Sequence, residues 1–235
     1  YVYSQDASVL NGSVGEMHAK KIVNLYQLAQ KTGSPVIGML DSSGIRLQES
    51  TDALNALGEI YKQQVRASGV IPQVCAIFGA CGGGMSILSS LADFTFMEKE
   101  NGRLFVNEPD TLQDNYKEKC DTAQAAFQSE KTGNVAVVCS KEEIFAEIRE
   151  LVSFLPSNFE EEDADRECQD DLNRLTENMS AELTDPALAL FDIADDRNFY
   201  ETGKSFAKEM VTGFLRLDGQ VIGAVANRTE CIGED

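Results

Sequence analysis

The first part of the chain alternates between short apolar runs and longer stretches in which apolar residues recur every three or four positions. The runs predict strands, and the spaced patterns predict helices between them. The predicted strands cover residues 1–6, 35–41, 72–78, 93–97 and 134–139. Near-continuous apolar strands joined by helices are typical of a parallel sheet that is covered on both faces. The pattern therefore predicts an α/β fold.

The two predicted helices before residue 70 carry signals at their ends. Ser13 and Glu16 have the spacing of a capping box, and Gly33 and Gly69 are typical of residues that follow a helix. The buried face of the first helix is predicted to contain Met17, Val23, Leu25 and Leu28. The buried face of the second is predicted to contain Leu54, Leu57, Ile60 and Val65.

The composition changes after a later helix, which is predicted by a second capping box, Ser140 with Glu143. Its buried face is predicted to contain Ile144, Ile148, Leu151 and Leu155. Residues 159–186 are then rich in carboxylates and poor in apolar residues, which is typical of a solvated linker. We therefore predict a domain at residues 1–158, an acidic linker at 159–186 and the start of a second, incomplete domain at 187–235.

The last residues predict a β-hairpin. The sequence "LDGQ" places an Asp218–Gly219 turn between the apolar runs 211–217 and 221–227. Such strands have unpaired edges, which proteins normally cover, so we expect them to pair with more of the same polypeptide or with another copy. Because the chain starts at Tyr1 inside an apolar run, we also expect part of a natural N-terminus to be missing.

Composition narrows the classes of partner and location. The 235 residues include 39 Asp and Glu but only 20 Lys and Arg, a net charge of −19, so we expect no nucleic acid partner. The single histidine disfavours a zinc site, and six scattered cysteines are typical of reduced cytosolic thiols. No apolar run reaches the length of a membrane span. We therefore expect a cytoplasmic protein.

Two glycine-containing loops follow buried strands: "DSSGIR" at residues 41–46 and "GACGGG" at 79–84. Because ligands of α/β sheets collect where strands end, we expect both loops to lie together. Gly82, Gly83 and Gly84 would let a ligand oxygen approach bare backbone N–H groups, which suit developing negative charge. Close packing of a helix against a strand, without a ligand, is an equal alternative. The spacing is not the G-x-G-x-x-G of dinucleotide loops.

Four stretches resemble, in this order and spacing, the carboxyltransferase subunits of biotin-dependent acyl-CoA carboxylases and decarboxylases: "YVYSQDASVLNGSVGEMHAKKI", "PVIGMLDSSGIRLQE", "ASGVIPQVCAIFGACGGGMSILSSLADFTFM" and "LVSFLPSN". The propionyl-CoA carboxylase β and methylmalonyl-CoA decarboxylase α subunits are members. The sequence "GFLRLDGQVIGAVANR" is similar to the start of the family's second domain. The resemblance implies a crotonase-like (ClpP-like) fold, which is a stacked β-β-α superhelix.

The resemblance also implies an activity, the transfer of a carboxyl group between biotin and the α-carbon of an acyl-CoA. Biotin would arrive as carboxybiotin on a carrier protein, with a biotin carboxylase or a membrane decarboxylase subunit as a further partner. The protein would stabilise the thioester enolate and the biotin ureido enolate through preorganised N–H donors. The second domain of another subunit normally supplies the biotin side, so a homo-oligomer is expected. Attachment to the periphery of a membrane decarboxylase complex is an alternative location.

The resemblance implies that Gly83 and Gly84 are the catalytic residues, because they match the glycines that form the thioester oxyanion hole in the family. It assigns the acyl-CoA side of the site to Ser42, Ser43, Gly44, Ile45, Arg46 and Gly82. Arg46 could meet a phosphate or hold its loop, and it could equally pair with Glu49. Ile45 could narrow the acyl pocket or pack inward.

Two features depart from the family pattern. Ser43 and Ile45 replace the small residues of the usual D-S-G-G-A-R, and residues 112–139 lack the family's Gly-Gly element and the histidine after it. These departures put the local substrate contacts, and activity itself, in question. His18 is interpreted as a surface or packing residue, and Asp41 as a cap of its loop.

Three functions are therefore compatible with the sequence. A carboxyltransferase is favoured by the resemblance. A crotonase-type hydratase or hydrolase would need a carboxylate base beside the glycines, for which Glu108 is the nearest candidate. A catalytically decayed paralogue that acts as an assembly subunit is favoured by the departures. The sequence does not distinguish among acyl-CoA substrates, or carboxylation from sodium-pumping decarboxylation.

Overall fold

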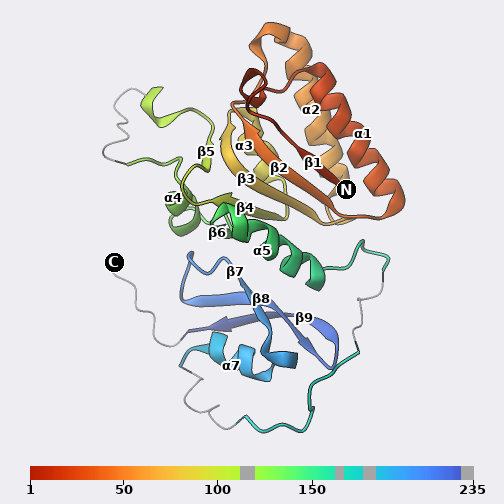
Figure 1. Cartoon of the computed structure of the whole chain (residues 1–235), viewed down its shortest axis with the longest axis vertical. Helices are drawn as coiled ribbons and strands as arrows, with labels where there is room; N and C mark the ends of the chain where they lie inside the picture. Colours follow the sequence, from red (N-terminus) through yellow and green to blue (C-terminus); the bar gives the residue numbers. More distant parts are fainter. Residues whose placement is uncertain (112–119, 162–166, 177–183, 229–235) are drawn as a thin grey trace.

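The computed structural model describes residues 1–111, 120–161, 167–176 and 184–228. At the centre of this described part lies a parallel sheet of six strands in the order β1-β2-β3-β4-β6, with β5 paired to the far end of β3 (Figure 1). The strands are β1 (Val2–Ser4), β2 (Val36–Ser42), β3 (Gln73–Gly82), β4 (Phe94–Glu98), β5 (Arg103–Phe105) and β6 (Val137–Cys139). The prediction of a parallel α/β sheet is confirmed.

The middle of the sheet is buried on both faces because side chains of a strand alternate between them. In β3, Cys75 and Ile77 belong to one apolar cluster, and Val74 and Ala76 belong to another on the opposite face. Because both faces of β3 lie against apolar side chains, its sequence does not alternate between apolar and polar residues. This explains the continuous apolar run from which β3 was predicted.

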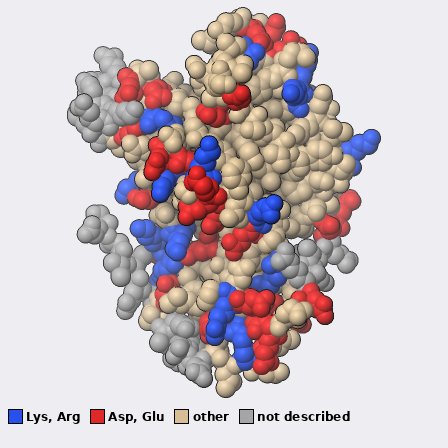
Figure 2. Space-filling model, in the orientation of Figure 1, with Lys and Arg blue, Asp and Glu red and all other residues tan. Residues whose placement is uncertain are grey.

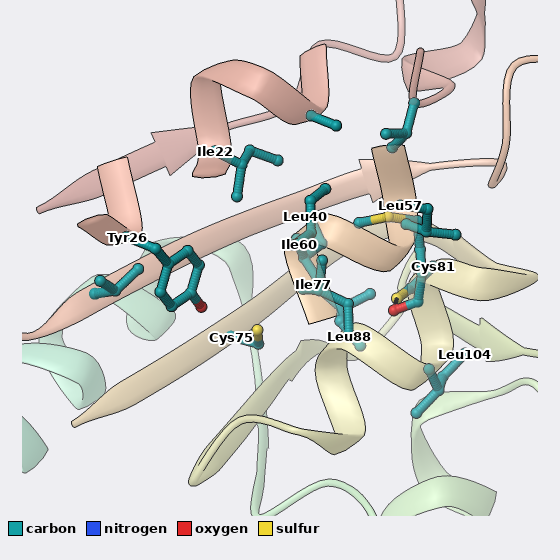
Figure 3. Packing of buried hydrophobic residues seen from close by; sticks show 14 of the residues in the cluster. Ile22, Tyr26, Leu40, Leu57, Ile60, Cys75, Ile77, Cys81, Leu88 and Leu104 are labelled. Carbon is teal, nitrogen blue, oxygen red and sulfur yellow. Dashed lines mark hydrogen bonds between the residues drawn. The ribbon is translucent and has the colours of Figure 1, made fainter. Parts of the chain in front are cut away.

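Helices cover the two faces of the sheet. On one face lie α1 (Glu16–Thr32), α2 (Ser50–Ala67) and the short α3 (Gly84–Ser90), and on the other lies α5 (Lys141–Phe154). Figure 3 shows Ile22 of α1 and Ile60 of α2 beside Leu40 of β2. The short α4 (Ala125–Glu130) follows β5 in the chain. Four single-turn 3₁₀ helices connect other described elements: η1 (Leu10–Gly12), η2 (Leu47–Glu49), η3 (Pro109–Thr111) and η4 (Asp195–Arg197).

A second, antiparallel sheet packs on the outer side of α5. It consists of β7 (Phe199–Thr202), β8 (Met210–Leu217) and β9 (Gln220–Asn227), and it follows α7 (Pro186–Ile193). The ring of Phe154 on α5 lies 6.2 Å from that of Tyr200 and 6.4 Å from that of Phe214. The Arg216 guanidinium lies 4.5 Å from the centre of the Phe154 ring. Helix α5 is therefore enclosed between the two sheets.

The capping box predicted at the start of the first helix is wrong. Helix α1 begins at Glu16, its N-cap is Gly15, and no side chain of the cap accepts a hydrogen bond. The Glu16 N–H instead donates to Glu49 Oε2 at 2.6 Å. A Cβ on Gly15 would lie 2.2 Å from Glu49 Oε1, so only glycine allows this carboxylate to approach. A distant carboxylate thus replaces the local capping box that Ser13 was predicted to form.

The predicted buried faces of α1 and α2 are wrong in part. Met17 and Leu28 are 67% and 52% exposed, and Leu54 and Val65 of α2 are also exposed. The buried positions of α1 are Ala19, Ile22, Tyr26 and Ala29. Their spacing of three, four and three residues follows one stripe of a helix, from which Met17 and Leu28 diverge. Alanine is only weakly apolar, so the sequence pattern of this helix favours its bulkier residues over Ala19 and Ala29. Leu57 and Ile60 of α2 are buried as predicted.

Two local predictions are confirmed. The Ser140 hydroxyl accepts the Glu143 N–H at 3.4 Å, and the Glu143 carboxylate accepts the Ser140 N–H at 2.9 Å. The β8–β9 hairpin turns at Asp218 and Gly219, which both have positive φ, as a two-residue turn of this kind needs. Among the described strands β9 pairs with β8 alone, and Val225 on β9 is 72% exposed.

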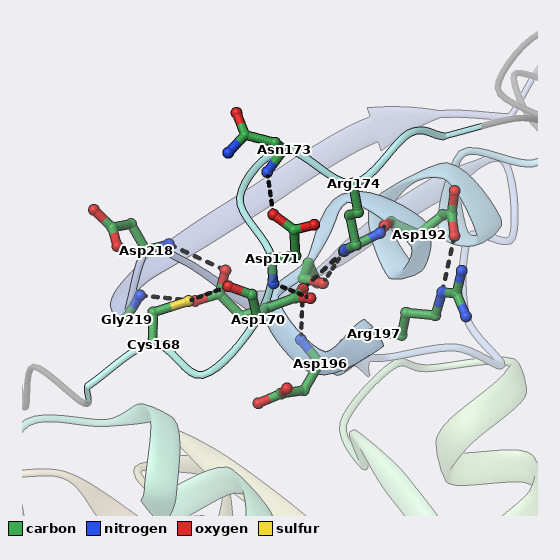
Figure 4. Close-up of polar contacts among 12 residues, drawn as sticks. Cys168, Asp170, Asp171, Asn173, Arg174, Asp192, Asp196, Arg197, Asp218 and Gly219 are labelled. Carbon is green, nitrogen blue, oxygen red and sulfur yellow. Dashed lines mark hydrogen bonds and ion pairs between the residues drawn. The ribbon is translucent and has the colours of Figure 1, made fainter.

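Part of the predicted acidic linker is anchored to the C-terminal end of α7. The Arg174 guanidinium donates to the carbonyl oxygens of Asp192 and Ala194 and to the Asp170 carboxylate (Figure 4). Residues 167–176 therefore do not behave as a freely solvated linker, whereas residues 162–166 and 177–183 lie outside the described ranges. The division into domains at residues 158 and 187 remains a proposal.

Candidate functional site

The two glycine-containing loops lie in direct contact, as predicted. Ser42 at the end of β2 pairs with Cys81 near the end of β3. Gly44 has a φ of +118°, and a Cβ there would lie 3.1 Å from the Gly82 carbonyl oxygen and 3.9 Å from Gly83 Cα. The backbone of the first loop thus touches the backbone of the second. A side chain at Gly44 would separate them.

Asp41 joins the two loops through its side chain. A register shift between Leu40 and Ser42 interrupts the ladder, and Asp41 Oδ1 accepts the Ala80 N–H at 3.1 Å. A Cβ on Gly79 would lie 2.3 Å from the same oxygen, so a glycine is needed there for the carboxylate to reach β3. Asp41 therefore holds the loop, as predicted.

The three consecutive glycines occupy three different environments. A Cβ on Gly82 would lie 2.8 Å from the Phe105 ring and 3.0 Å from the Ser43 carbonyl oxygen. A Cβ on Gly84 would lie 2.3 Å from Leu57 Cδ2. A Cβ on Gly83 would meet no heavy atom within 4 Å among the described residues. Gly82 and Gly84 thus permit close packing, whereas Gly83 faces open space.

The backbone N–H groups of the first loop are mostly occupied. The Ser43 N–H donates to the Asn11 carbonyl at 3.0 Å, and the Gly44 N–H donates to Ser42 Oγ at 3.2 Å. The Arg46 N–H donates to the Val14 carbonyl at 2.9 Å. Within the described ranges the Ile45 N–H has no acceptor. It points away from Val14, because alternate peptide groups of a strand face opposite sides.

The glycine loop also has one occupied and one free backbone N–H group. The Gly83 N–H donates to the carbonyl of Phe105 at 3.0 Å, across the β3–β5 pairing. The Gly84 N–H has no acceptor among the residues that the structure places. In this conformation the free donors beside the Gly44–Gly83 contact are therefore those of Ile45 and Gly84. The Gly83 amide, which the family resemblance assigns to the oxyanion hole together with that of Gly84, is occupied.

Arg46 and Ile45 serve the loop itself. The Arg46 guanidinium donates to the Ser13 carbonyl at 2.9 Å and pairs with the Glu49 carboxylate at 3.0 Å. Of the interpretations open for Arg46, the structure thus supports holding the loop and pairing with Glu49. Ile45 packs against the main apolar cluster, while Ser43 is exposed. Glu49 also links this loop to α1, a role that no sequence pattern indicates.

His18 is connected to the same loop. Its Nε2 lies 3.3 Å from Gln5 Nε2, and Gln5 Oε1 accepts the Asp41 N–H at 3.2 Å. Since the Gln5 amide nitrogen donates, the His18 Nε2 is the acceptor and the ring is neutral. Burial lowers the pKa of His18, which agrees with a neutral ring. The packing role predicted for His18 is therefore extended to support of the loop.

Glu108, the candidate base of a hydratase, is held in an ion pair. Arg103 lies 3.1 Å from the Glu108 carboxylate and 3.0 Å from both oxygens of Asp121. The ion pair directs the Glu108 carboxylate to Arg103, so it is not a free carboxylate aimed at the glycine loop. The hydratase interpretation therefore lacks its central residue.

Other kinds of site find no support in the described part of the chain. The placed residues include no group of three or more His, Cys, Asp or Glu that could hold a metal ion, and no helix long and apolar enough to cross a membrane. The five cysteines within the described ranges are free thiols. On the face drawn in Figure 2, acidic and basic side chains are interspersed. Residues 112–119, part of the stretch that departs from the family pattern, lie outside the described ranges.

Comparisons with known proteins agree with this geometry. The family model described as "Carboxyl transferase domain" matches residues 1–233. The propionyl-CoA carboxylase beta chain of Roseobacter denitrificans is 37% identical over 97% of this chain and 47% of its own length. The methylmalonyl-CoA decarboxylase subunit alpha of Propionigenium modestum is 36% identical over 98% of this chain and 47% of its own.

A solved structure extends the likeness to the fold. The crystal structure of transcarboxylase 12S, a hexamer with hydrolysed methylmalonyl-coenzyme A bound, superposes with a TM-score of 0.88 at 30% identity, covering 97% of this chain and 46% of that one. The crotonase-like carboxyltransferase fold expected from the sequence is thus confirmed. The chain spans about half the length of the curated relatives it matches. With a family match along almost all of its residues, the chain belongs to the carboxyl transferase domain family.

Proposed function

We propose that this chain forms the acyl-CoA side of a biotin-dependent carboxyltransferase, which moves a carboxyl group between biotin and the α-carbon of an acyl-CoA. The observation that carries the proposal is the pair of free backbone N–H groups, of Ile45 and Gly84, next to the Gly44–Gly83 contact. Family membership supports the same assignment.

The chemistry needs such donors more than it needs acids or bases. When the bond between the α-carbon and its carboxyl group breaks, the electron pair moves into the thioester and leaves negative charge on the carbonyl oxygen. In the opposite direction biotin that has given up its carboxyl group would take a proton from the α-carbon through its ureido nitrogen, and the same charge would develop on the carbonyl oxygen. Fixed N–H donors at that oxygen stabilise the enolate, and loss of one donor costs on the order of a hundredfold in rate.

The predicted site residues take distinct parts in this proposal. Gly84 and Ile45 supply the N–H donors, and Gly83 supplies the open space in which the thioester carbonyl lies. Gly44 and Gly82 bring the two loops together. The others, Ser42, Ser43 and Arg46, shape the acyl-CoA side of the site. The donor pair that the family resemblance implies, Gly83 with Gly84, is thus replaced by Ile45 with Gly84. The reason is that the Phe105 carbonyl already accepts the Gly83 N–H.

The biotin side requires further protein. The two free N–H groups suffice for one oxyanion, so they fit the thioester but not the ureido oxygen of biotin in addition. We propose that carboxybiotin arrives on a carrier protein and is held by a second carboxyltransferase domain, contributed by another copy in a homo-oligomer. A biotin carboxylase or a membrane decarboxylase subunit would complete the assembly. We keep the expectation of a cytoplasmic location, or one at the periphery of a membrane complex.

A label-exchange assay on the full-length protein tests the proposal. We expect exchange of labelled carboxyl groups between malonyl-CoA or methylmalonyl-CoA and free biotin. Gly83→Ala should reduce this exchange at least tenfold, because its methyl group enters the space assigned to the thioester. Gly69→Ala is the matched control, since Gly69 also has positive φ and open surroundings but lies at the end of α2. No exchange by the wild-type protein, or equal rates for both variants, would contradict the proposal.

One observation favours the second candidate, a decayed assembly subunit. The Phe105 carbonyl satisfies the Gly83 N–H, so one of the two amides expected to act is withdrawn from the site. Full-length protein that assembles and binds an acyl-CoA, yet exchanges no label, would identify this case.

A further inference from the structure

The free Gly84 N–H belongs to a peptide group whose other end is held twice. This peptide group joins Gly83 to Gly84, and the Gly83 carbonyl oxygen is its acceptor. Ser86 Oγ donates to that oxygen at 2.7 Å, and the Ser86 N–H donates to it at 3.2 Å. Ser86 is buried, with 6% of its surface exposed, so little water competes for this bond.

The next peptide group is held by a tyrosine from a different helix. Tyr61 on α2 donates its hydroxyl to the Gly84 carbonyl oxygen at 2.5 Å. As the first residue of α3, Gly84 also has its carbonyl in the position that accepts the Leu88 N–H in an α-helix. The tyrosine hydroxyl is thus a second donor, which the carbonyl does not need in order to be satisfied.

The hydrogen bonds from Ser86 and Tyr61 matter for the direction of the Gly84 N–H because this residue is a glycine. A glycine has no Cβ to restrict its backbone, so the peptide groups on either side of Gly84 would otherwise turn more freely than at any other residue. A misdirected N–H contributes little to an oxyanion hole, because the donor must be aimed before the charge develops. The site therefore needs restraints outside Gly84 itself.

We propose that Ser86 and Tyr61 are positioning residues that fix and polarise the peptide groups around the Gly84 N–H. The inference rests on the proposed function of that N–H as an oxyanion donor. Ser86 acts on the same peptide group, and donation to its carbonyl makes the N–H at the other end a stronger donor. Tyr61 fixes the following peptide group and, through it, the direction of the first turn of α3.

Two variants separate this role from packing. Ser86→Ala removes one hydroxyl, and alanine is the better helix former. Tyr61→Phe removes only the hydroxyl and keeps the ring, which packs against the main apolar cluster. In full-length protein each should lower kcat of label exchange about three- to tenfold, the scale of one net hydrogen bond, with KM for methylmalonyl-CoA changed less than twofold. Both should melt within a few degrees of wild type.

Matched controls lie close by. Ser89→Ala removes a buried hydroxyl of the same helix that donates, at 2.9 Å, to the carbonyl three residues earlier, just as Ser86 does. Tyr26→Phe removes a buried tyrosine hydroxyl on α1, outside the loops. Neither should change kcat by more than a factor of two.

Infrared spectroscopy supplies a readout that a structural role would not move. The stretching frequency of a ¹³C-labelled thioester carbonyl should fall when methylmalonyl-CoA binds, and Ser86→Ala should diminish that fall while Ser89→Ala leaves it unchanged. An active wild type with the same kcat and frequency in Ser86→Ala and Tyr61→Phe would overturn the positioning roles alone. A wild type that neither exchanges label nor shifts the carbonyl frequency would overturn the proposed function and this inference with it.

Discussion

Two glycines in neighbouring helices should respond in opposite ways to the same substitution. Gly84 begins α3, and a Cβ there would lie 2.3 Å from Leu57 Cδ2 and 2.7 Å from Tyr61 Oη. Gly58 lies inside α2, and a Cβ there would meet no heavy atom within 4 Å among the described residues. Alanine is therefore overpacked at the first position and unopposed at the second.

The magnitudes follow from the two surroundings. Leu57 is buried, so it has no room to turn away, and overpacking of this kind costs about 1–3 kcal/mol of the free energy of unfolding. At Gly58, replacing glycine by alanine in a helix stabilises by up to about 1 kcal/mol. For a protein of this size 1 kcal/mol corresponds to about 2–4 °C in Tm. We expect Gly84→Ala to melt about 2–12 °C below wild type and Gly58→Ala a few degrees above it.

Thermal unfolding of the two full-length variants, followed by circular dichroism beside wild type, measures this difference. A Gly84→Ala protein as stable as wild type would show that α2 and α3 are not in the contact described. A Gly58→Ala protein that is less stable would show that the exposed face of α2 is covered. The result also decides how activity data are interpreted. A Gly84→Val variant that loses activity would not separate the oxyanion donor from packing against α2, whereas Gly83→Ala fills the open space beside that donor without meeting another described residue.

Two further outcomes concern charged groups. Burial lowers the pKa of His18 below its usual value, so the unfolded chain binds the proton more readily than the folded chain. The free energy of unfolding should therefore fall as the pH falls below about 6.5. Urea unfolding between about pH 5 and 8 should show a weaker pH dependence in His18→Gln than in wild type. An identical dependence in both would contradict the burial of His18. Asp121→Asn should cost about 2–3 kcal/mol and Glu108→Gln under 1 kcal/mol, because Arg103 binds both carboxylates but the Asp121 side chain is 4% exposed and that of Glu108 33%. Equal costs in urea unfolding would refute this ranking.

The sequence predicted those features whose determinants lie close together in the chain. The capping box at Ser140 and the turn at Asp218 each involve neighbours within three residues, and both are confirmed. The cap of α1 was missed because its acceptor, Glu49, lies 33 residues from Glu16. The buried face of α1 was misjudged because alanines, which carry a weak apolar signal, occupy positions where the helix comes closest to its neighbours.

The site shows the same division. Its location could be predicted, because consecutive parallel strands end at one edge of the sheet and place the loops after β2 and β3 together. Which amides remain free could not be predicted, because that depends on partners from other elements. Phe105 comes from β5, and Asn11 and Val14 come from the segment before α1. No sequence pattern at Phe105 indicates that its carbonyl accepts the Gly83 N–H.

Three glycines in a row look like one feature, yet each answers a separate requirement. Gly82 allows the Phe105 ring and the Ser43 carbonyl to approach, and Gly84 allows α2 to approach. Only Gly83 leaves space unfilled, and its φ of +57° is one that glycine adopts without strain. The open space at Gly83 therefore lies between two tightly packed neighbours. A substitution at Gly82 or Gly84 would disturb this space through packing, while one at Gly83 would fill it directly.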